Sequence, residues 1–230
     1  MNIVALVQAR LGSTRLPCKM MLHLHGLPVI DWVIRRSMRS LLLNALAAAV
    51  PVNSLDDPLA AHLEARGTRV FRGPEADVLR RFRLAAEAAK ATHVVRICAD
   101  NPLVWGGEID TLIRRFLDSP DQDMLYAYNH IPLNNLYPDG FGAEMVSMPL
   151  LRLLDEEAAL PAHREHCLSF IHDNPERFRI MTFDPPEASM RRPDVRLDLD
   201  TPEDYRKLAL MPIHPDMPPE QVLALYPPQG

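Results

Sequence analysis

Residues 3–19 read Ile-Val-Ala-Leu-Val-Gln-Ala-Arg-Leu-Gly-Ser-Thr-Arg-Leu-Pro-Cys-Lys, an apolar run that passes directly into a polar, cationic loop. The unbroken aliphatic residues at 3–7 predict a strand buried on both faces. The loop then places a glycine, two small hydroxyl residues and three cations between positions 10 and 19. Because ligands of open α/β sheets bind beyond the carboxyl ends of the strands, the sequence predicts an anion-binding loop here.

Strand-like runs alternate with helical periodicity through the first half of the chain, a pattern typical of βαβ units and a parallel sheet. We expect strands near residues 3–7, 45–50, 68–71 and 92–98, and later near 179–183 and 195–199. We expect helices around residues 29–38, 57–67, 78–89, 109–117, 149–158 and 162–173, and from 202 onward. The predicted fold class is therefore α/β: a Rossmann-like three-layer sandwich with a mostly parallel sheet, in one domain of residues 1–230.

The segment 124–148 departs from this pattern. Residues 124–128 and 143–148 are predicted as two strands around a polar, Asn-rich excursion that contains glycine. We interpret it as a small β arm. Its tyrosines and leucines are compatible with burial against a second copy of the chain, so we expect a dimerisation or substrate arm.

Composition excludes several classes of protein. The net charge is −5, and a nucleic-acid-binding surface needs Lys and Arg concentrated on one face. The three cysteines are widely spaced with no CxxC pair, so the sequence predicts neither a zinc site nor a redox motif, and a reducing compartment fits best. The first apolar run is too short for a signal peptide or a membrane span. We expect a cytoplasmic protein that binds neither nucleic acid nor membrane.

The residues of the loop have the chemistry of a triphosphate site. Backbone N–H groups of a turn containing Gly12 can point at phosphate oxygens, Arg10 and Arg15 can bind them bidentately, and Lys19 adds a compact charge. The loop has neither the P-loop pattern nor the spaced glycines of a dinucleotide fingerprint. Composition alone leaves a second interpretation open, in which the loop is only a solvated basic turn.

Two aspartates are predicted to reach the same edge of the sheet. Asp100 follows the strand at 92–98, and the segment 196–200, Arg-Leu-Asp-Leu-Asp, ends another predicted strand. Mg²⁺ prefers carboxylates, water and substrate phosphates, so this pair suits a metal–nucleotide complex. Asp198 and Asp200 alternate along the segment and would share a face. The alternatives are structural: Asp100 before Asn-Pro as a turn former, and Asp200 as part of a helix start.

The loop resembles the motif Q-A-R-x-G-S-T-R-L-P-G-K of the cytidylyltransferases related to CMP-sialic acid and CMP-Kdo synthetases, most closely the spore coat polysaccharide (SpsF-like) branch. The resemblance spans nearly the whole chain. It departs at Cys18, where the family has glycine, and a side chain there removes the easy access to positive φ angles. The resemblance implies the nucleotide-diphospho-sugar transferase type of fold, CTP as substrate, Mg²⁺ as cofactor, an acidic sugar acceptor and a homodimer.

The resemblance also implies roles for particular residues. Asp100 and Asp200 are similar to the family's metal ligands, with Asp198 as a weaker third. Three further stretches are similar to family motifs: F-R-G-x-x-x-D-V near residue 72, P-D-G-x-x-x-E at 138–144 and R-E-H at 164–166. From the loop motif, the segment around Asp100 and these three stretches together, we assign nucleotide binding to Ala9, Arg10, Gly12, Ser13, Arg15, Lys19, Arg72 and Asp77. We assign acceptor binding to Arg96, Asn101, Asp139, Glu144, Arg164, Glu165 and His166. Each stretch also has a structural alternative: a Pro-Asp-Gly turn is a common hairpin device, a charged tripeptide on a helix is usually solvated, and Arg72 is equally compatible with a surface cation.

The expected reaction is attack by an acceptor oxygen on the α-phosphorus of CTP, with pyrophosphate leaving, in the synthesis of a surface polysaccharide or glycoconjugate. We expect Arg10, Arg15, Lys19 and Asp100 to be catalytic, and His166 is the candidate base for an alcohol acceptor. Three alternatives stay open: another nucleotidyltransferase, a glycosyltransferase of GT-A-like fold, and a nucleotide-binding module without catalysis.

Overall fold

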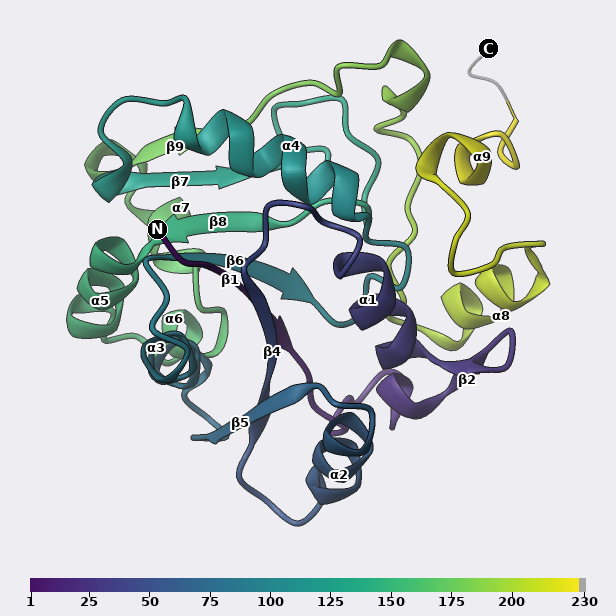
Figure 1. The fold of residues 1–230 in the computed structure, drawn as a ribbon, viewed down its shortest axis with the longest axis horizontal. Coiled ribbons are helices and arrows are strands. Elements are labelled where there is room, and N and C mark those ends of the chain that lie inside the picture. Colours follow the sequence, from purple (N-terminus) through teal and green to yellow (C-terminus); the bar gives the residue numbers. More distant parts are fainter. Residues whose placement is uncertain (228–230) are drawn as a thin grey trace.

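A seven-stranded sheet forms the centre of the molecule (Figure 1), and the computed structural model describes residues 1–227 of the chain. Its strand order is β5-β4-β1-β6-β8-β7-β9. The strands are β1 (Ile3–Gln8), β4 (Ala45–Pro51), β5 (Arg69–Gly73), β6 (His93–Cys98), β7 (Leu125–Tyr128), β8 (Glu144–Ser147) and β9 (Arg179–Met181). Only β8 runs against its neighbours in this sheet, so the sheet is mostly parallel, as predicted.

Helices cover both faces of the sheet and make the predicted three layers. The helices are α1 (Val29–Ser37), α2 (Asp57–Ala65), α3 (Val78–Ala88), α4 (Gly106–Leu117), α5 (Met148–Glu157), α6 (Pro161–Glu165), α7 (Ser169–Asp173), α8 (Pro202–Leu210) and α9 (Pro219–Leu223). Apolar residues of α1, α2, α4, α8 and α9 pack into one core, and those of α3, α5 and α7 into a second. Strand β1 serves both cores, because side chains alternate across a strand: Ala5 and Val7 face the first, and Val4 and Leu6 face the second.

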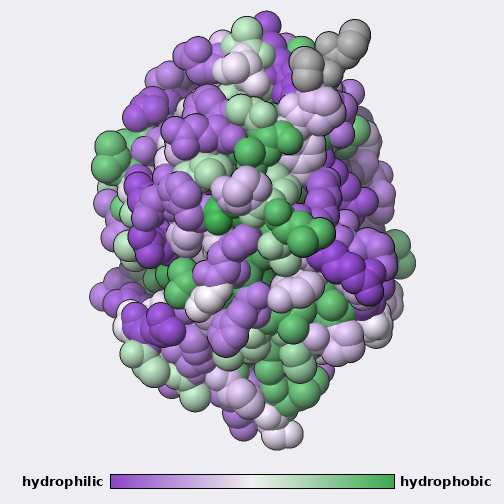
Figure 2. Space-filling model, turned by 90° about the vertical axis from the view of Figure 1, so that its right-hand side faces the viewer, coloured by the Kyte–Doolittle hydropathy of each residue, from purple (hydrophilic) through white to green (hydrophobic). Residues whose placement is uncertain are grey.

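A small two-stranded antiparallel sheet of β2 (His23–Leu24) and β3 (Leu27–Pro28) lies beside α1 and α8 (Figure 1). This side of the molecule faces the viewer in Figure 2. Hydrophobic residues gather in the lower half of that view, between hydrophilic residues on either side. Across residues 1–227, no helix has the length and apolar character needed to cross a bilayer.

The structure corrects the arm predicted at 124–148. Its two strands, β7 and β8, belong to the central sheet, where β8 pairs with both β6 and β7. All eight residues of the two strands are buried, which suits the middle of a sheet and not a protruding hairpin. Only the connection 129–143 lies outside the sheet. A role of this segment in dimerisation stays a prediction.

Two other expectations also need correction. The strand predicted at 195–199 is an extended segment with one isolated bridge, between Arg196 and Asp139. It contacts two different loops, because Leu197 N donates to Asp139 O (3.1 Å) and Leu199 N to Asp100 O (2.8 Å). The helix predicted at 162–173 is divided into α6 and α7. The strands predicted at 3–7, 45–50, 68–71 and 92–98 are confirmed as β1, β4, β5 and β6.

The strand order places a ligand site between β1 and β6. From β1 the chain moves outward to β4 and β5, and then returns to the other side of β1 as β6. Such a reversal opens a crevice at the carboxyl ends of the two central strands, where ligands of open α/β sheets bind. The loop after β1 and the loop after β6, with Asp100, both lie at this edge.

Candidate active site

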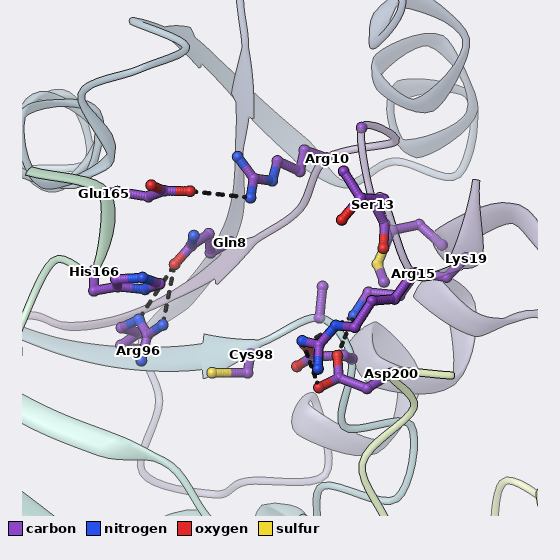
Figure 3. A pocket seen from close by; sticks show the side chains of 15 residues that line it. Gln8, Arg10, Ser13, Arg15, Lys19, Arg96, Cys98, Glu165, His166 and Asp200 are labelled. Atoms are coloured by element: carbon purple, nitrogen blue, oxygen red, sulfur yellow. Dashed lines mark hydrogen bonds and ion pairs between the residues drawn. The ribbon is translucent and has the colours of Figure 1, made fainter. Parts of the chain in front are cut away.

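A cavity of about 380 Å³ opens at the carboxyl ends of β1 and β6 (Figure 3). It is lined by Gln8, Arg10, Gly12, Ser13, Thr14, Arg15, Lys19, Met20, Arg96, Cys98, Ala99, Asp100, Glu165, His166 and Asp200. The cations of the loop thus share one cavity with the two aspartates and with part of the Arg-Glu-His motif. This arrangement disfavours the interpretation of the loop as only a solvated turn.

The loop after β1 is held in shape by contacts with its own backbone and with the chain after β4. Cys18 N donates to Leu11 O (3.2 Å) and closes the loop. Leu11 N in turn donates to the buried carboxylate of Asp56 (2.6 Å). Cys18 has φ 55° and ψ 23°, the left-handed conformation in which glycine has no steric penalty. A non-glycine residue there costs about 1–2 kcal/mol, so Cys18 is accommodated under strain.

Lys19 joins the loop to both aspartates. Its Nζ lies 3.0 Å from Asp100 Oδ2, 3.0 Å from Asp200 Oδ1 and 3.1 Å from Leu199 O. Arg15 Nη2 lies 2.9 Å from Asp200 Oδ2. Burial alone would lower the pKa of Lys19, but the two carboxylates outweigh it and raise that pKa above its ordinary value. The ammonium is therefore charged at neutral pH.

The oxygen atoms around Lys19 fit a hard divalent cation. Carboxylate oxygens of Asp100 and Asp200 and the carbonyl oxygen of Leu199 surround one position. The positively charged ammonium of Lys19 occupies that position. Mg²⁺ is commonly held by one or two carboxylates together with water and substrate phosphates. Within residues 1–227 no group of three or more His, Cys, Asp or Glu could hold a metal ion by itself. The site therefore suits a metal that arrives with phosphates.

The start of α8 explains why Asp200 is available. Thr201 is the N-cap of α8, and its side chain accepts a hydrogen bond from Asp204 N. The side chain of Asp204 accepts in turn from Thr201 N, which completes a capping box. The cap leaves the side chain of Asp200 free to face the cavity. The helix-start interpretation and the ligand interpretation of this segment are thus both compatible with the structure, on neighbouring residues. Asp198 instead pairs with Arg196 and does not line the cavity.

At the end of the cavity away from Asp200, an ion pair between Arg96 and Glu144 forms the floor. Arg96, on β6, pairs with Glu144, on β8, and Tyr126 donates to Glu144 Oε1 (2.7 Å). Burial alone would raise the pKa of Glu144, but the guanidinium of Arg96 outweighs it and lowers that pKa to about 2. Arg96 also donates from Nε and Nη2 to Gln8 Oε1 (3.3 and 3.2 Å). Because Arg has only donors, Gln8 must turn its NH₂ group away from Arg96.

Glu165 and His166 complete the wall above this floor. In Figure 3 they lie on the side of the cavity away from Asp200, and Glu165 points toward Arg10. Glu165 Oε1 and Arg10 Nη2 are 3.5 Å apart, and both side chains are about half exposed. The predicted nucleotide side and the predicted acceptor side thus meet at this pair.

Arg72, Asp77 and Arg164 are predicted site residues that do not line the cavity. Arg72 donates to the carbonyl of Asn53 (3.0 Å) and pairs with Asp57 (2.8 Å), so it supports the connection after β4. Asp77 caps α3 and pairs with Arg164 (2.6 Å). A direct contact of these three with a ligand stays a prediction.

Other predicted residues lie beneath or beside the cavity without lining it. Ala9, Asn101 and Glu144 are buried, and Glu144 pairs with Arg96, which does line the cavity. Asp139 lies beside the segment 195–197. Burial, the carboxylate of Asp198 and then those of Asp100 and Asp200 raise the pKa of Asp139 to about 7.

Sequence reasoning missed several residues that form the site. Gln8, Thr14, Met20 and Cys98 line the cavity. The position of Gln8 at the end of a predicted strand was a usable signal. Asp56 is a further case: its carboxylate accepts from Leu11 N, a contact across 45 positions that no local pattern indicates.

Comparison with known proteins agrees with this geometry. A family model described as Cytidylyltransferase matches residues 4–226. The spore coat polysaccharide biosynthesis protein SpsF of Bacillus subtilis is 34% identical over 212 residues, which cover 90% of this chain and 85% of that protein. The structure of a cytidylyltransferase from Leptospira borgpetersenii serovar Hardjo-bovis superposes with a TM-score of 0.82 at 28% identity, covering 91% of this chain and 85% of the other.

A more distant structure supports the fold alone. CMP:2-keto-3-deoxy-manno-octonic acid synthetase, solved in complex with CTP, superposes with a TM-score of 0.67 at 17% identity. The superposition covers 91% of this chain and 97% of that one.

Proposed function

The chain belongs to the cytidylyltransferase family, and from this premise we propose that it transfers CMP from CTP to an acidic sugar with release of pyrophosphate. The observation that supports the proposal best is the single cavity that joins a cationic loop to two carboxylates at the carboxyl edge of the sheet. The product would be an activated CMP-sugar for a surface polysaccharide or glycoconjugate.

The loop would hold the triphosphate. Arg10 and Arg15 supply planar forks of N–H donors, and Lys19 supplies a compact charge, all within one cavity. Ser13 and the backbone of Gly12 add hydrogen-bond donors beside them. These groups would bind the β- and γ-phosphates and stabilise the charge that develops on the leaving pyrophosphate.

In the proposed reaction an acceptor oxygen forms a bond to the α-phosphorus while the bond to the bridging oxygen of the β-phosphate breaks. The protein lowers the barrier by positioning and charge neutralisation, so no nucleophilic side chain is needed. Asp100 and Asp200 would hold Mg²⁺. When bound, the ion would polarise the α-phosphate as a Lewis acid.

The acceptor would lie at the opposite end, above Arg96 and Gln8 and beside Glu165 and His166. An acidic sugar carries several hydroxyl groups and a carboxylate, which suit a wall of mixed donors and acceptors. If the attacking group is an alcohol, His166 is our candidate for the base that removes its proton.

The test supplies each of the four NTPs with Mg²⁺ and a panel of acidic sugars of the sialic-acid and Kdo types. Pyrophosphate release and the mass of the nucleotide product are measured, with reactions lacking acceptor as controls. The proposal expects release from CTP that depends on acceptor, with a CMP-sugar as product. Equal release from ATP or UTP would favour another nucleotidyltransferase. A parallel reaction supplies a sugar nucleotide in place of the NTP, and sugar transfer there would favour a glycosyltransferase. CTP binding without turnover on any acceptor would favour a binding module.

We also propose that the chain forms a homodimer through the connection 129–143. Leu133 and Leu136 are 44% and 39% exposed there, which supports a surface covered by a partner. Light scattering at micromolar concentration should give twice the mass of 26.0 kDa. A monomeric mass would contradict this proposal without affecting the proposed reaction.

A further inference from the structure

Lys19 is bound to the residues that would hold the metal. Its ammonium contacts Asp100, Asp200 and the carbonyl of Leu199 at 3.0, 3.0 and 3.1 Å. The side chain of Lys19 is only 11% exposed, and those of Asp200 and Asp100 are 16% and 33% exposed. Water therefore screens these ion pairs less than it would on an open surface.

This arrangement uses every hydrogen-bond donor of Lys19. A lysine ammonium has three N–H groups, and three oxygen atoms lie within 3.1 Å of Nζ. Lys19 therefore has no donor left for a phosphate unless it releases one of these partners. A divalent cation between the same carboxylates would meet the positive ammonium at close range, so the two cations exclude each other.

We propose that Lys19 is a latch that keeps the metal-binding carboxylates closed until a triphosphate draws its ammonium away. The proposal rests on the proposed function, in which Lys19 binds the triphosphate and Asp100 and Asp200 bind the metal. Metal then enters together with the nucleotide and binds the nucleotide-free protein only weakly. By linkage, a change that removes Lys19 from the carboxylates must strengthen metal binding, and a change that weakens the hold of the carboxylates on Lys19 must strengthen triphosphate binding.

The surrounding chain allows this movement without a change of fold. Lys19 begins the short 3₁₀ helix Lys19–Met21, and its flexible four-carbon stem can swing while the backbone stays in place. Arg15, which also contacts Asp200, is 66% exposed and free to turn. In Figure 3 both side chains reach from the loop across to Asp200, with the rest of the cavity beside them.

The first experiment measures Mn²⁺ binding without nucleotide, by the electron paramagnetic resonance signal of free Mn²⁺. It compares the wild type with Lys19→Met and with Arg114→Met as the matched control. Arg114 is exposed on α4 and lies outside the cavity, so its variant removes the same charge without touching the latch. We expect Lys19→Met to bind Mn²⁺ about tenfold more tightly, which corresponds to about 1.4 kcal/mol, and the control to be unchanged. Equal or weaker binding by a folded Lys19→Met would overturn the proposal.

The second experiment keeps Lys19 and measures CTP binding by calorimetry in EDTA at pH 8. Asp100→Asn weakens one side of the latch, so it should bind metal-free CTP several-fold more tightly. Asp139→Asn is the control, because Asp139 carries a nearby negative charge but does not contact Lys19. The same gain in both variants would show simple charge repulsion and overturn the latch. Failure of every form to bind CTP would overturn the proposed function itself.

Discussion

Replacing Glu144 by glutamine should destabilise the protein through the charge of Arg96. The side chain of Glu144 is 5% exposed and that of Arg96 is 19% exposed, so little solvent reaches the pair. Glutamine keeps the size of the side chain and can still form a hydrogen bond with Tyr126. What the variant loses is the negative charge, and it leaves a guanidinium buried without a counter-ion.

Breaking a buried pair from one side typically costs about 3–5 kcal/mol. Because Arg96 keeps some contact with the cavity, we expect a loss of roughly 3 kcal/mol, near the lower limit. For a chain of this size each kcal/mol shifts the midpoint by about 2–4 °C, so the melting temperature should fall by roughly 6–12 °C. Urea unfolding followed by circular dichroism at pH 7 measures the free energy directly.

The pH dependence identifies the charge as the cause. The pKa of Glu144 is lowered from 4.5 to about 2 in the folded state, so its stabilising effect is complete above 4.5 and is lost as pH falls toward 2. The difference in free energy of unfolding between wild type and Glu144→Gln should therefore be constant near neutral pH and should become smaller below pH 4.5. Tyr126→Phe is the comparison: it removes one hydrogen bond to Glu144 and keeps the ion pair with Arg96, so its loss at pH 7 should be smaller, about 1 kcal/mol. A loss under about 1 kcal/mol for Glu144→Gln at pH 7 would refute this reasoning.

Three further changes test other parts of the structure. Cys18→Gly should raise the free energy of unfolding by roughly 0.5 kcal/mol, because relief of the left-handed strain exceeds the added chain entropy; a lower value in urea unfolding would contradict this. Asp139→Asn should raise the melting temperature at pH 8 but not at pH 4, because the raised pKa of about 7 makes the wild type less stable as pH rises. An equal rise in melting temperature at the two pH values would contradict this. Asp56→Ala should weaken CTP binding about fivefold in calorimetry, since Leu11 N loses its acceptor and the loop loosens; unchanged affinity would show that the loop is held by other contacts.

The sequence predicted the fold well where the signal was local. The aliphatic run of β1 and the alternation of strands with amphipathic helices were sufficient to predict a mostly parallel sheet. The prediction of an arm at 124–148 was wrong because the neighbour of a strand in the sheet is determined by contacts between residues far apart in the sequence. The residues of β8 show which positions are apolar, but not that β8 inserts between β6 and β7.

The same limit applies to the site. Arg164, Glu165 and His166 are consecutive, yet Arg164 turns to Asp77, while the other two line the cavity. Their directions follow from the short turn at the end of α6, which residue types do not specify. Asp200 shows the opposite case, because Thr201 supplies the cap of α8, so local chemistry alone explains why the side chain of Asp200 is not needed for capping.

The most direct test of the account is a crystal structure of the protein with Mg²⁺ and CTP. The account predicts the β- and γ-phosphates within hydrogen-bond distance of Arg10, Arg15 and Lys19, with the α-phosphate beside Asp100 and Asp200. A triphosphate bound elsewhere would contradict it, for example one at the second pocket, which is lined by Leu27, Asp31, Ile34, Arg35, Arg66 and Thr68.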